Sequence, residues 1–132
     1  MATNVALVRQ YAALEKDYPP PAGANAVGMA QEPNCSDLLT IHLRVSPRRY
    51  VEAAGFTLTA SACDTVRACA VKCCQLAEKK AVLASFTVTA DDIAHALSED
   101  GAPDQEHIHC AQMAELALKR AVVAFSRQCR DS

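Results

Sequence analysis

The sequence predicts an α+β domain in which strands come first along the chain and helices follow. Residues 38–45 alternate apolar and polar side chains, a period of two that is typical of a strand with one buried face. From residue 64 onward the apolar side chains recur at helical spacing instead. A chain of 132 residues can bury one substantial core without a second domain. We therefore expect a small antiparallel sheet with helices packed against it.

The N-terminal segment is expected to be a separate piece of the structure. Residues 3–17 place apolar side chains at roughly helical spacing, which predicts a first helix. Prolines 19–21 then end it, because proline lacks the backbone donor of a helix and favours an extended chain. We expect residues 1–24 to form a mobile helix with a proline-rich linker, and residues 25–132 to form the folded domain.

The sheet is predicted from two extended segments that are close in sequence. After the strand at 38–45, the turn at 47–49 leads into residues 50–60, which also read as a strand. This connection is too short for a parallel crossover, so the two strands should pair antiparallel. A short apolar stretch at 26–29 precedes both of them.

The helices are predicted from the second half of the chain. The segment from Thr89 to Asp92 resembles a capping box with Asp in place of the usual Glu or Gln, so a helix should begin there. We expect helices over three segments, at 64–80, 89–97 and 110–127.

Composition excludes several function classes. The 13 Lys and Arg residues against 15 Asp and Glu give a net charge of −2, which argues against a nucleic-acid binder. Residues 1–8 lack a cationic start followed by a long apolar block, so we expect neither a signal peptide nor a membrane span, and a cytoplasmic location. No glycine-rich phosphate loop is found among the four glycines, so nucleotide chemistry has no motif here.

The seven cysteines fall into two groups. In a reducing compartment, thiols serve as metal ligands, nucleophiles or small core residues more often than as disulfide partners. Cys69 and Cys73 lie on an apolar helical stripe, which favours core packing. Cys74 points about 100° away around the helix and is interpreted as an inert thiol. Cys129, in a charged terminal segment, is interpreted as an exposed one.

The second group occupies junctions between predicted elements. Cys35 precedes a strand, Cys63 lies between a strand and a helix, and Cys110 opens the last helix. Such side chains can point into a shared cleft without occupying the core, and a helix N-terminus favours the thiolate of Cys63 and Cys110. Each alone could equally be a small buried hydrophobe. Together they favour a metal or sulfur site, although no pair has the two-residue spacing of a zinc or iron–sulfur signature.

Oxygen and nitrogen donors lie beside these cysteines. Asp37 could donate a carboxylate oxygen beside Cys35, whereas Asp64 could equally be a first-turn residue that interacts with the helix dipole. Among the histidines, His109 is the best ligand candidate because Cys110 follows it. His107 is interpreted as a supporting or solvated group. Surface positions are expected for the remaining histidines, His42 and His95.

The order of these motifs resembles the IscU/NifU-type iron–sulfur cluster scaffold family. The resemblance covers roughly residues 25–123. It rests on Cys35-Ser36-Asp37 before a strand, Ala62-Cys63-Asp64 after a strand, and His109-Cys110 opening the last helix with Met113-Ala114-Glu115 following. It implies a sheet of about three strands, with residues 26–29 as the short first member, and helices packed against it.

The resemblance also implies a function. Cys35, Cys63 and Cys110, with Asp37 or His109 as an exchangeable fourth ligand, would hold a nascent, transient [2Fe–2S] cluster, and zinc could occupy the empty site. A cysteine desulfurase would supply persulfide sulfur, and the cluster would pass to apo iron–sulfur recipient proteins. Three soft thiolates with one harder ligand suit a cluster that must later leave. A scaffold of this kind is an acceptor and donor, not an enzyme.

The sequence also departs from the family pattern. Ser36 and Ala62 stand where the family has glycines, which restricts the backbone. The Leu-Pro-Pro-Val-Lys segment that recruits a dedicated heat-shock chaperone is absent before His109, which argues against chaperone-assisted release. Two alternatives therefore remain, a zinc-bound SufU-like sulfur acceptor and a partner-binding relative without cluster chemistry. The sequence leaves open whether the protein forms a homo-oligomer.

Overall fold

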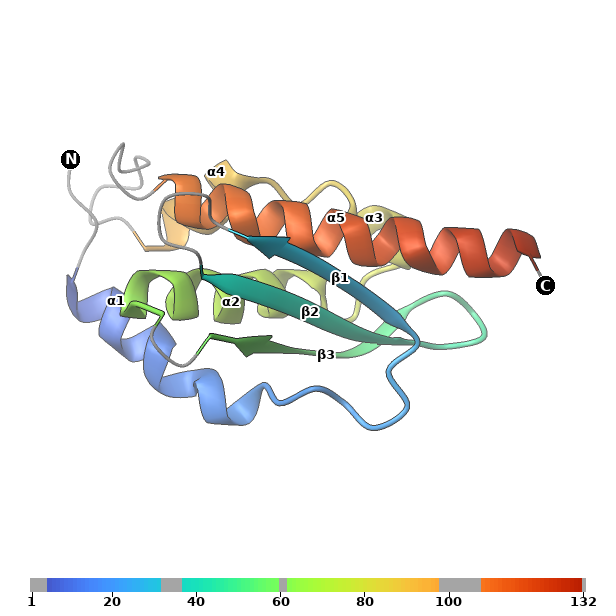
Figure 1. Ribbon diagram of the computed structural model, residues 1–132, viewed down its shortest axis with the longest axis horizontal. Coiled ribbons are helices and arrows are strands. Elements are labelled where there is room, and N and C mark those ends of the chain that lie inside the picture. Colours follow the sequence, from blue (N-terminus) through green and yellow to red (C-terminus); the bar gives the residue numbers. More distant parts are fainter. Residues whose placement is uncertain (1–4, 32–36, 60–61, 98–107, 132) are drawn as a thin grey trace.

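The computed structural model has two layers, a three-stranded antiparallel sheet and the helices that cover one of its faces (Figure 1). The structure describes residues 5–31, 37–59, 62–97 and 108–131. Its elements are α1 (Val5–Ala12), the 3₁₀ segment η1 (Ala13–Asp17), β1 (Ala26–Gln31), β2 (Leu38–Val45), β3 (Val51–Leu58), α2 (Asp64–Ala77), α3 (Val82–Ser85), α4 (Ala90–Ala96) and α5 (Ile108–Asp131).

The sheet confirms the strand predictions. β2 lies in the middle and pairs antiparallel with β1 on one side and β3 on the other. Its Leu39, Ile41 and Leu43 side chains are fully buried and face the helices, as the period of two predicted. β1 continues two residues past the predicted stretch, to Gln31, because its pairing with β2 extends to Leu38.

Several helix boundaries differ from the predicted ones; α5, for example, ends at Asp131 instead of residue 127. α2 ends at Ala77 instead of residue 80, because the next residues pair with the start of β3: Lys79 N–H donates to Val51 O, and Val51 N–H donates to Lys80 O, each at 2.8 Å. The last helix begins at Ile108, two residues before the predicted start, and Ile108 packs against the core. The short helix α3 was not predicted.

The capping box was predicted correctly. Thr89 Oγ1 accepts a hydrogen bond from Asp92 N–H at 3.2 Å, and Thr89 N–H donates to Asp92 Oδ2 at 3.1 Å. These two bonds satisfy donors that a helix start leaves without partners. α4 therefore begins where local chemistry alone placed it.

α5 packs unusually close to β1. A methyl group added at Gly28 would collide with backbone atoms of Ala117, Arg120 and Ala121. The Arg120 guanidinium reaches across and donates from Nη1 to Met29 O at 2.7 Å. Glycine on the strand and alanine on the helix thus let the two backbones touch.

The N-terminal helix lies against α2 (Figure 1). Val8 is buried, Arg67 Nη1 pairs with Glu15 Oε2 at 2.6 Å, and Lys72 Nζ lies 5.6 Å from the centre of the Tyr11 ring. The mobility of this helix stays a prediction. Among the described helices, none combines the length with the unbroken apolar run needed to cross a bilayer.

Candidate metal and sulfur site

Three strand ends and two helix starts meet at one end of the molecule. In Figure 1, β1 and β3 finish, and β2, α2 and α5 begin, at the same end. The gathering follows from the antiparallel sheet, in which β1 and β3 run toward the end where β2 begins. α2 and α5 begin at the same end. Asp37, Cys63, His109 and Cys110 therefore share one end of the fold. Cys35 and His107 lie outside the described residues.

Cys63 is the accessible thiol of the site. It is the N-cap residue of α2 and has an extended backbone, with φ −76° and ψ 164°. Its side chain is exposed, and its carbonyl accepts Arg67 N–H at 3.3 Å. The position confirms the prediction of a cysteine at a helix start. Asp64, which follows, is an exposed residue of the first turn.

Cys110 differs from the expectation. It was expected to point into a cleft without occupying the core, and that expectation is wrong: the side chain is 3% exposed and belongs to the core cluster. Because α5 begins at Ile108, Cys110 is already inside the first turn, on the buried stripe that continues through Ala114 and Leu118. The helical stripe, also readable in the sequence, determines its direction.

The two other described candidates have intermediate or low exposure. Asp37, which directly precedes the central strand β2, is 7% exposed, and His109 is half-buried. The donor types fit an iron or zinc site, since they combine soft thiols with oxygen and nitrogen. Within residues 5–31, 37–59, 62–97 and 108–131, however, no three acidic, histidine or cysteine side chains form a group that could hold a metal ion. The fold brings the candidates to one end without closing a ligand set around a point.

Comparison with known proteins decides the family. The family model of the NifU-like N terminal domain matches residues 10–131. The chain belongs to this family. The IscU 1 and IscU 2 iron–sulfur cluster assembly scaffold proteins of Archaeoglobus fulgidus are each 31% identical to it over 105 residues, which cover 80% of this chain. The matched region spans only 65% of the length of those two relatives.

Solved structures share the NifU-like fold. A protein described as an assembly scaffold of the SUF system from Fervidobacterium islandicum matches with a TM-score of 0.66 and 13% identity, over 88% of this chain and 93% of that one. The N-terminal part of a NifU-like protein from Brucella abortus matches with a TM-score of 0.66 and 12% identity, over 92% and 93%. At these identities the likeness shows the α+β fold alone.

The remaining thiols of the NifU-like domain are mostly buried. Cys69, Cys73 and Cys74 lie in the core, as predicted for the helical stripe. Burial raises the pKa of all three, to about 12 for Cys73, where the Glu115 carboxylate adds to it. Cys129 was expected to be exposed, and this is wrong: α5 continues past it, and its side chain is half-buried against the core.

The two histidines that were assigned to the surface behave differently. His95 is exposed, as predicted. His42 is half-buried, which lowers its pKa, and its Nε2 atom is buried without a hydrogen-bond partner in the described part of the chain. The alternation along β2 placed His42 on the correct face, but it does not report what covers that face.

Sequence reasoning missed one neighbour of the site. Cys69 was assigned to core packing alone, yet it lies close enough to Cys110 and Cys63 for their charges to add to the burial that raises its pKa. The sequence did contain a signal for this neighbour, an equal spacing of residues on two helices. Cys69 and Cys73 are four residues apart on one helix, as are Cys110 and Ala114 on the other.

Proposed function

We propose that this NifU-like domain is a scaffold on which an iron–sulfur cluster is assembled and from which it is passed on. The observation that carries the proposal is the gathering of Asp37, Cys63, His109 and Cys110 at one end of a fold whose relatives are named cluster scaffolds. The cluster is cargo for such a protein. The chain would hold it and release it, which makes the protein a carrier and not an enzyme.

The proposed ligands are Cys35, Cys63 and Cys110, with Asp37 or His109 as the exchangeable fourth. Thiolates bind iron strongly, and one carboxylate or imidazole leaves a weaker position from which a [2Fe–2S] cluster can depart. The exposed Cys63 is suited to the first encounter with iron or sulfur. Cys110 would have to turn outward at the start of α5 to reach a cluster, because its side chain is only 3% exposed.

The proposed partners follow from what the scaffold needs. Sulfur would come as persulfide from a cysteine desulfurase, and the finished cluster would go to apo iron–sulfur proteins. Both partners would approach the end of the molecule where Cys63 is exposed, since the other thiols described there are buried.

The decisive experiment is cluster loading under anaerobic conditions. Wild-type protein incubated with ferrous iron, cysteine and a cysteine desulfurase should develop visible absorption and bind iron and sulfide in equal amounts. Cys35→Ser, Cys63→Ser and Cys110→Ser should each lose most of this cluster. Cys74→Ala is the matched control, because Cys74 is buried near the far end of α2. Normal loading in all three serine variants would overturn the proposal.

A second candidate is a zinc-bound sulfur acceptor, and the exposure of Cys63 favours it. An acceptor needs one accessible thiolate, and the other donors could hold zinc in a tetrahedral site. Metal analysis of protein purified without oxygen separates the two functions: persulfide transfer with zinc retained supports the acceptor. Protein that binds neither iron nor zinc would instead be a partner-binding relative.

A further inference from the structure

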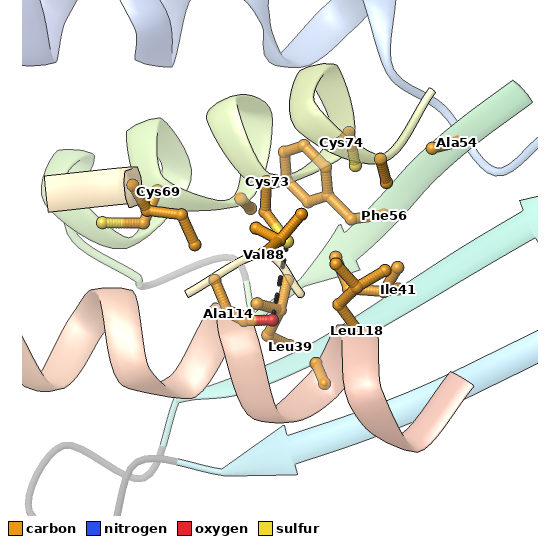
Figure 2. Close-up of a cluster of buried hydrophobic side chains, with 14 of the residues drawn as sticks. Leu39, Ile41, Ala54, Phe56, Cys69, Cys73, Cys74, Val88, Ala114 and Leu118 are labelled. Atoms are coloured by element: carbon orange, nitrogen blue, oxygen red, sulfur yellow. Dashed lines mark hydrogen bonds between the residues drawn. The ribbon is translucent and has the colours of Figure 1, made fainter. Parts of the chain in front are cut away.

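Cys69 is a buried thiol to which the scaffold function assigns no role. It lies on α2 one turn before Cys73, and its side chain is 1% exposed. Cys73 marks where α2 meets α5, because its Sγ–H donates to Ala114 O at 3.6 Å between the two helices, as Figure 2 shows. The position of Cys69 can therefore be read from that contact.

The two helices run parallel. Both begin at the end of the molecule where the site lies, and both extend toward the opposite end (Figure 1). Moving back by four residues, about one turn, keeps a side chain on the same face of its helix. On α2 this step leads from Cys73 to Cys69, and on α5 it leads from Ala114 to Cys110. Cys69 and Cys110 therefore face each other one turn closer to the site.

The electrostatics agree with this register. Burial is the main cause of the raised pKa of Cys69, and Cys110 is the first of the neighbouring titratable groups that add to it, ahead of Cys73 and Cys63. Both thiols are almost fully buried in the core, so bulk water has little access to either of them. In this turn the thiol of Cys69 faces another thiol, whereas one turn further along α2 the thiol of Cys73 faces the carbonyl oxygen of Ala114.

We propose that Cys69 is the resolving thiol of the scaffold site: it attacks a persulfide carried on Cys110 and releases the outer sulfur as sulfide. This inference rests on the proposed function, in which sulfur arrives as persulfide. A persulfide brings sulfur at the oxidation level of the element, whereas a cluster contains sulfide, so two electrons per sulfur must be supplied.

The step balances without another reactant. The Cys69 sulfur forms a bond to the inner sulfur of Cys110, the bond between that inner sulfur and the outer sulfur breaks, and the Cys69 proton leaves with the outer sulfur as H₂S. The two cysteine sulfurs are oxidised to a disulfide and the outer sulfur is reduced by two electrons. A dithiol or glutathione-type reductant then restores both thiols.

The surroundings suit such an exchange. The nucleophile in such an exchange is the thiolate, so the Cys69 proton has to pass to the outer sulfur as the new bond forms, which leaves a neutral disulfide and H₂S in the apolar core. Cys69 is 1% exposed, so oxidants in solution reach it slowly. Only a sulfur on a residue packed against it, such as Cys110, has ready access to it.

The contact is tested first, without any reference to clusters. The 132-residue chain is oxidised with diamide in the absence of denaturant, and its disulfides are mapped by mass spectrometry of peptides. A Cys69–Cys110 link is expected in wild type and in Cys73→Ala, which removes the neighbouring thiol of the same stripe. If Cys110 links to Cys63 or Cys73 but never to Cys69, the proposal is wrong.

The reaction is tested with glutathione persulfide as the sulfur donor, removed by desalting before H₂S release is followed. Wild type and Cys73→Ala should release sulfide and form the Cys69–Cys110 disulfide. Cys69→Ala should keep its persulfide on Cys110, and its rate of sulfide release should fall by about tenfold or more. Cys69→Ser, which preserves side-chain volume, replaces the alanine variant if the latter does not fold. Release from both Cys69 variants at the wild-type rate would overturn the proposal.

A last arm separates this inference from the scaffold function. With inorganic sulfide and ferrous iron supplied directly, Cys69→Ala should load a cluster as wild type does, because no persulfide has to be resolved. Loss of loading in this arm would make Cys69 a ligand or structural residue and would refute the resolving role. If wild type loads no cluster but still releases sulfide through Cys69, the scaffold function fails and the thiol exchange stands.

Discussion

The middle and the start of α5 are held in different ways. In the middle, Ala117 and Ala121 meet β1 at Gly28 backbone to backbone, with no room for a methyl group. At the start, Cys110 meets α2 through side chains, in the turn before the sulfur–carbonyl contact of Cys73. Backbone contact cannot adjust without moving the helix, whereas sulfur side chains are polarisable and can change rotamer. The helix is therefore fixed at its middle and adaptable at the end that carries the chemistry.

The largest expected effect comes from breaking the fixed region. Gly28→Ala should lower the free energy of unfolding by about 3 kcal/mol, because the methyl group would displace the backbone of α5. Urea unfolding measures the change. Gly23→Ala is the matched control: its φ of 77° should cost about 1 kcal/mol, but the added atom meets nothing closer than Arg44 Cδ at 3.8 Å. Equal losses would show that α5 is not anchored at Gly28.

The next effect concerns the support of the adaptable region. Glu115 accepts the Ala90 N–H at the start of α4 at 2.5 Å and Lys119 Nζ at 2.7 Å, so it ties α4 to the first turns of α5. Glu115→Ala should cost about 2 kcal/mol, because it removes a charge-assisted hydrogen bond at a helix N-terminus.

Hydrogen exchange should show where the effect of Glu115→Ala lies. Amide protection should fall at the start of α5 and stay unchanged around Ala117. Lys119→Ala, which leaves the bond to Ala90 in place, should cost less than about 0.5 kcal/mol. A loss of protection along the whole of α5 would contradict the division between a fixed middle and an adaptable start.

A smaller loss of stability is expected when either Cys69 or Cys73, the two buried thiols on successive turns of α2, is replaced. Cys69→Ala and Cys73→Ala each remove one buried sulfur of the same stripe, so each should cost about 1 kcal/mol in urea unfolding. Similar stabilities with different sulfide release would separate the chemistry of the pair from its packing. A much larger loss for Cys69→Ala would mean that this thiol is held for the core alone.

The smallest effect is a pH dependence that does not involve α5. Burial lowers the pKa of His42 below its ordinary value of 6.5, so the unfolded chain binds a proton more readily than the folded one does. Stability should therefore fall as the pH drops through and below 6.5. Unfolding at pH 5.5 and pH 7.5 measures the slope, which His42→Gln should reduce. His95→Gln, at an exposed position, should leave the slope unchanged.

Local chemistry made much of the fold predictable. The period of two along Leu38–Val45 gave both the bounds and the buried face of β2, since every second side chain must face the helices. The capping box placed the start of α4 because its bonds form within four residues. The helix α3 escaped prediction because four residues are too few to show a helical period.

The candidate site was only partly predictable, because the order of motifs along the chain does not show whether a side chain points outward or into the core. The sequence named Cys63 and Cys110 as two cysteines at helix starts and treated them alike. In the structure one is an exposed N-cap residue, and the other is buried inside a first turn. Cys110 lies on the buried stripe of α5 with Ala114 and Leu118, whereas Cys63 precedes the first turn of α2, and this difference separates the two outcomes.

The sequence by itself determined the order of elements, the helical stripes, the family pattern and the cysteines available for chemistry, because each follows from neighbours along the chain. Tertiary structure alone decided which groups meet. The parallel packing of α2 and α5 joins residues about 40 apart and sets Cys69 against Cys110, a register that no local pattern contains. Gly28 and the alanines of α5 allow the close approach that fixes the helix in place, so contact with β1 helps to position the end of α5 that carries Cys110.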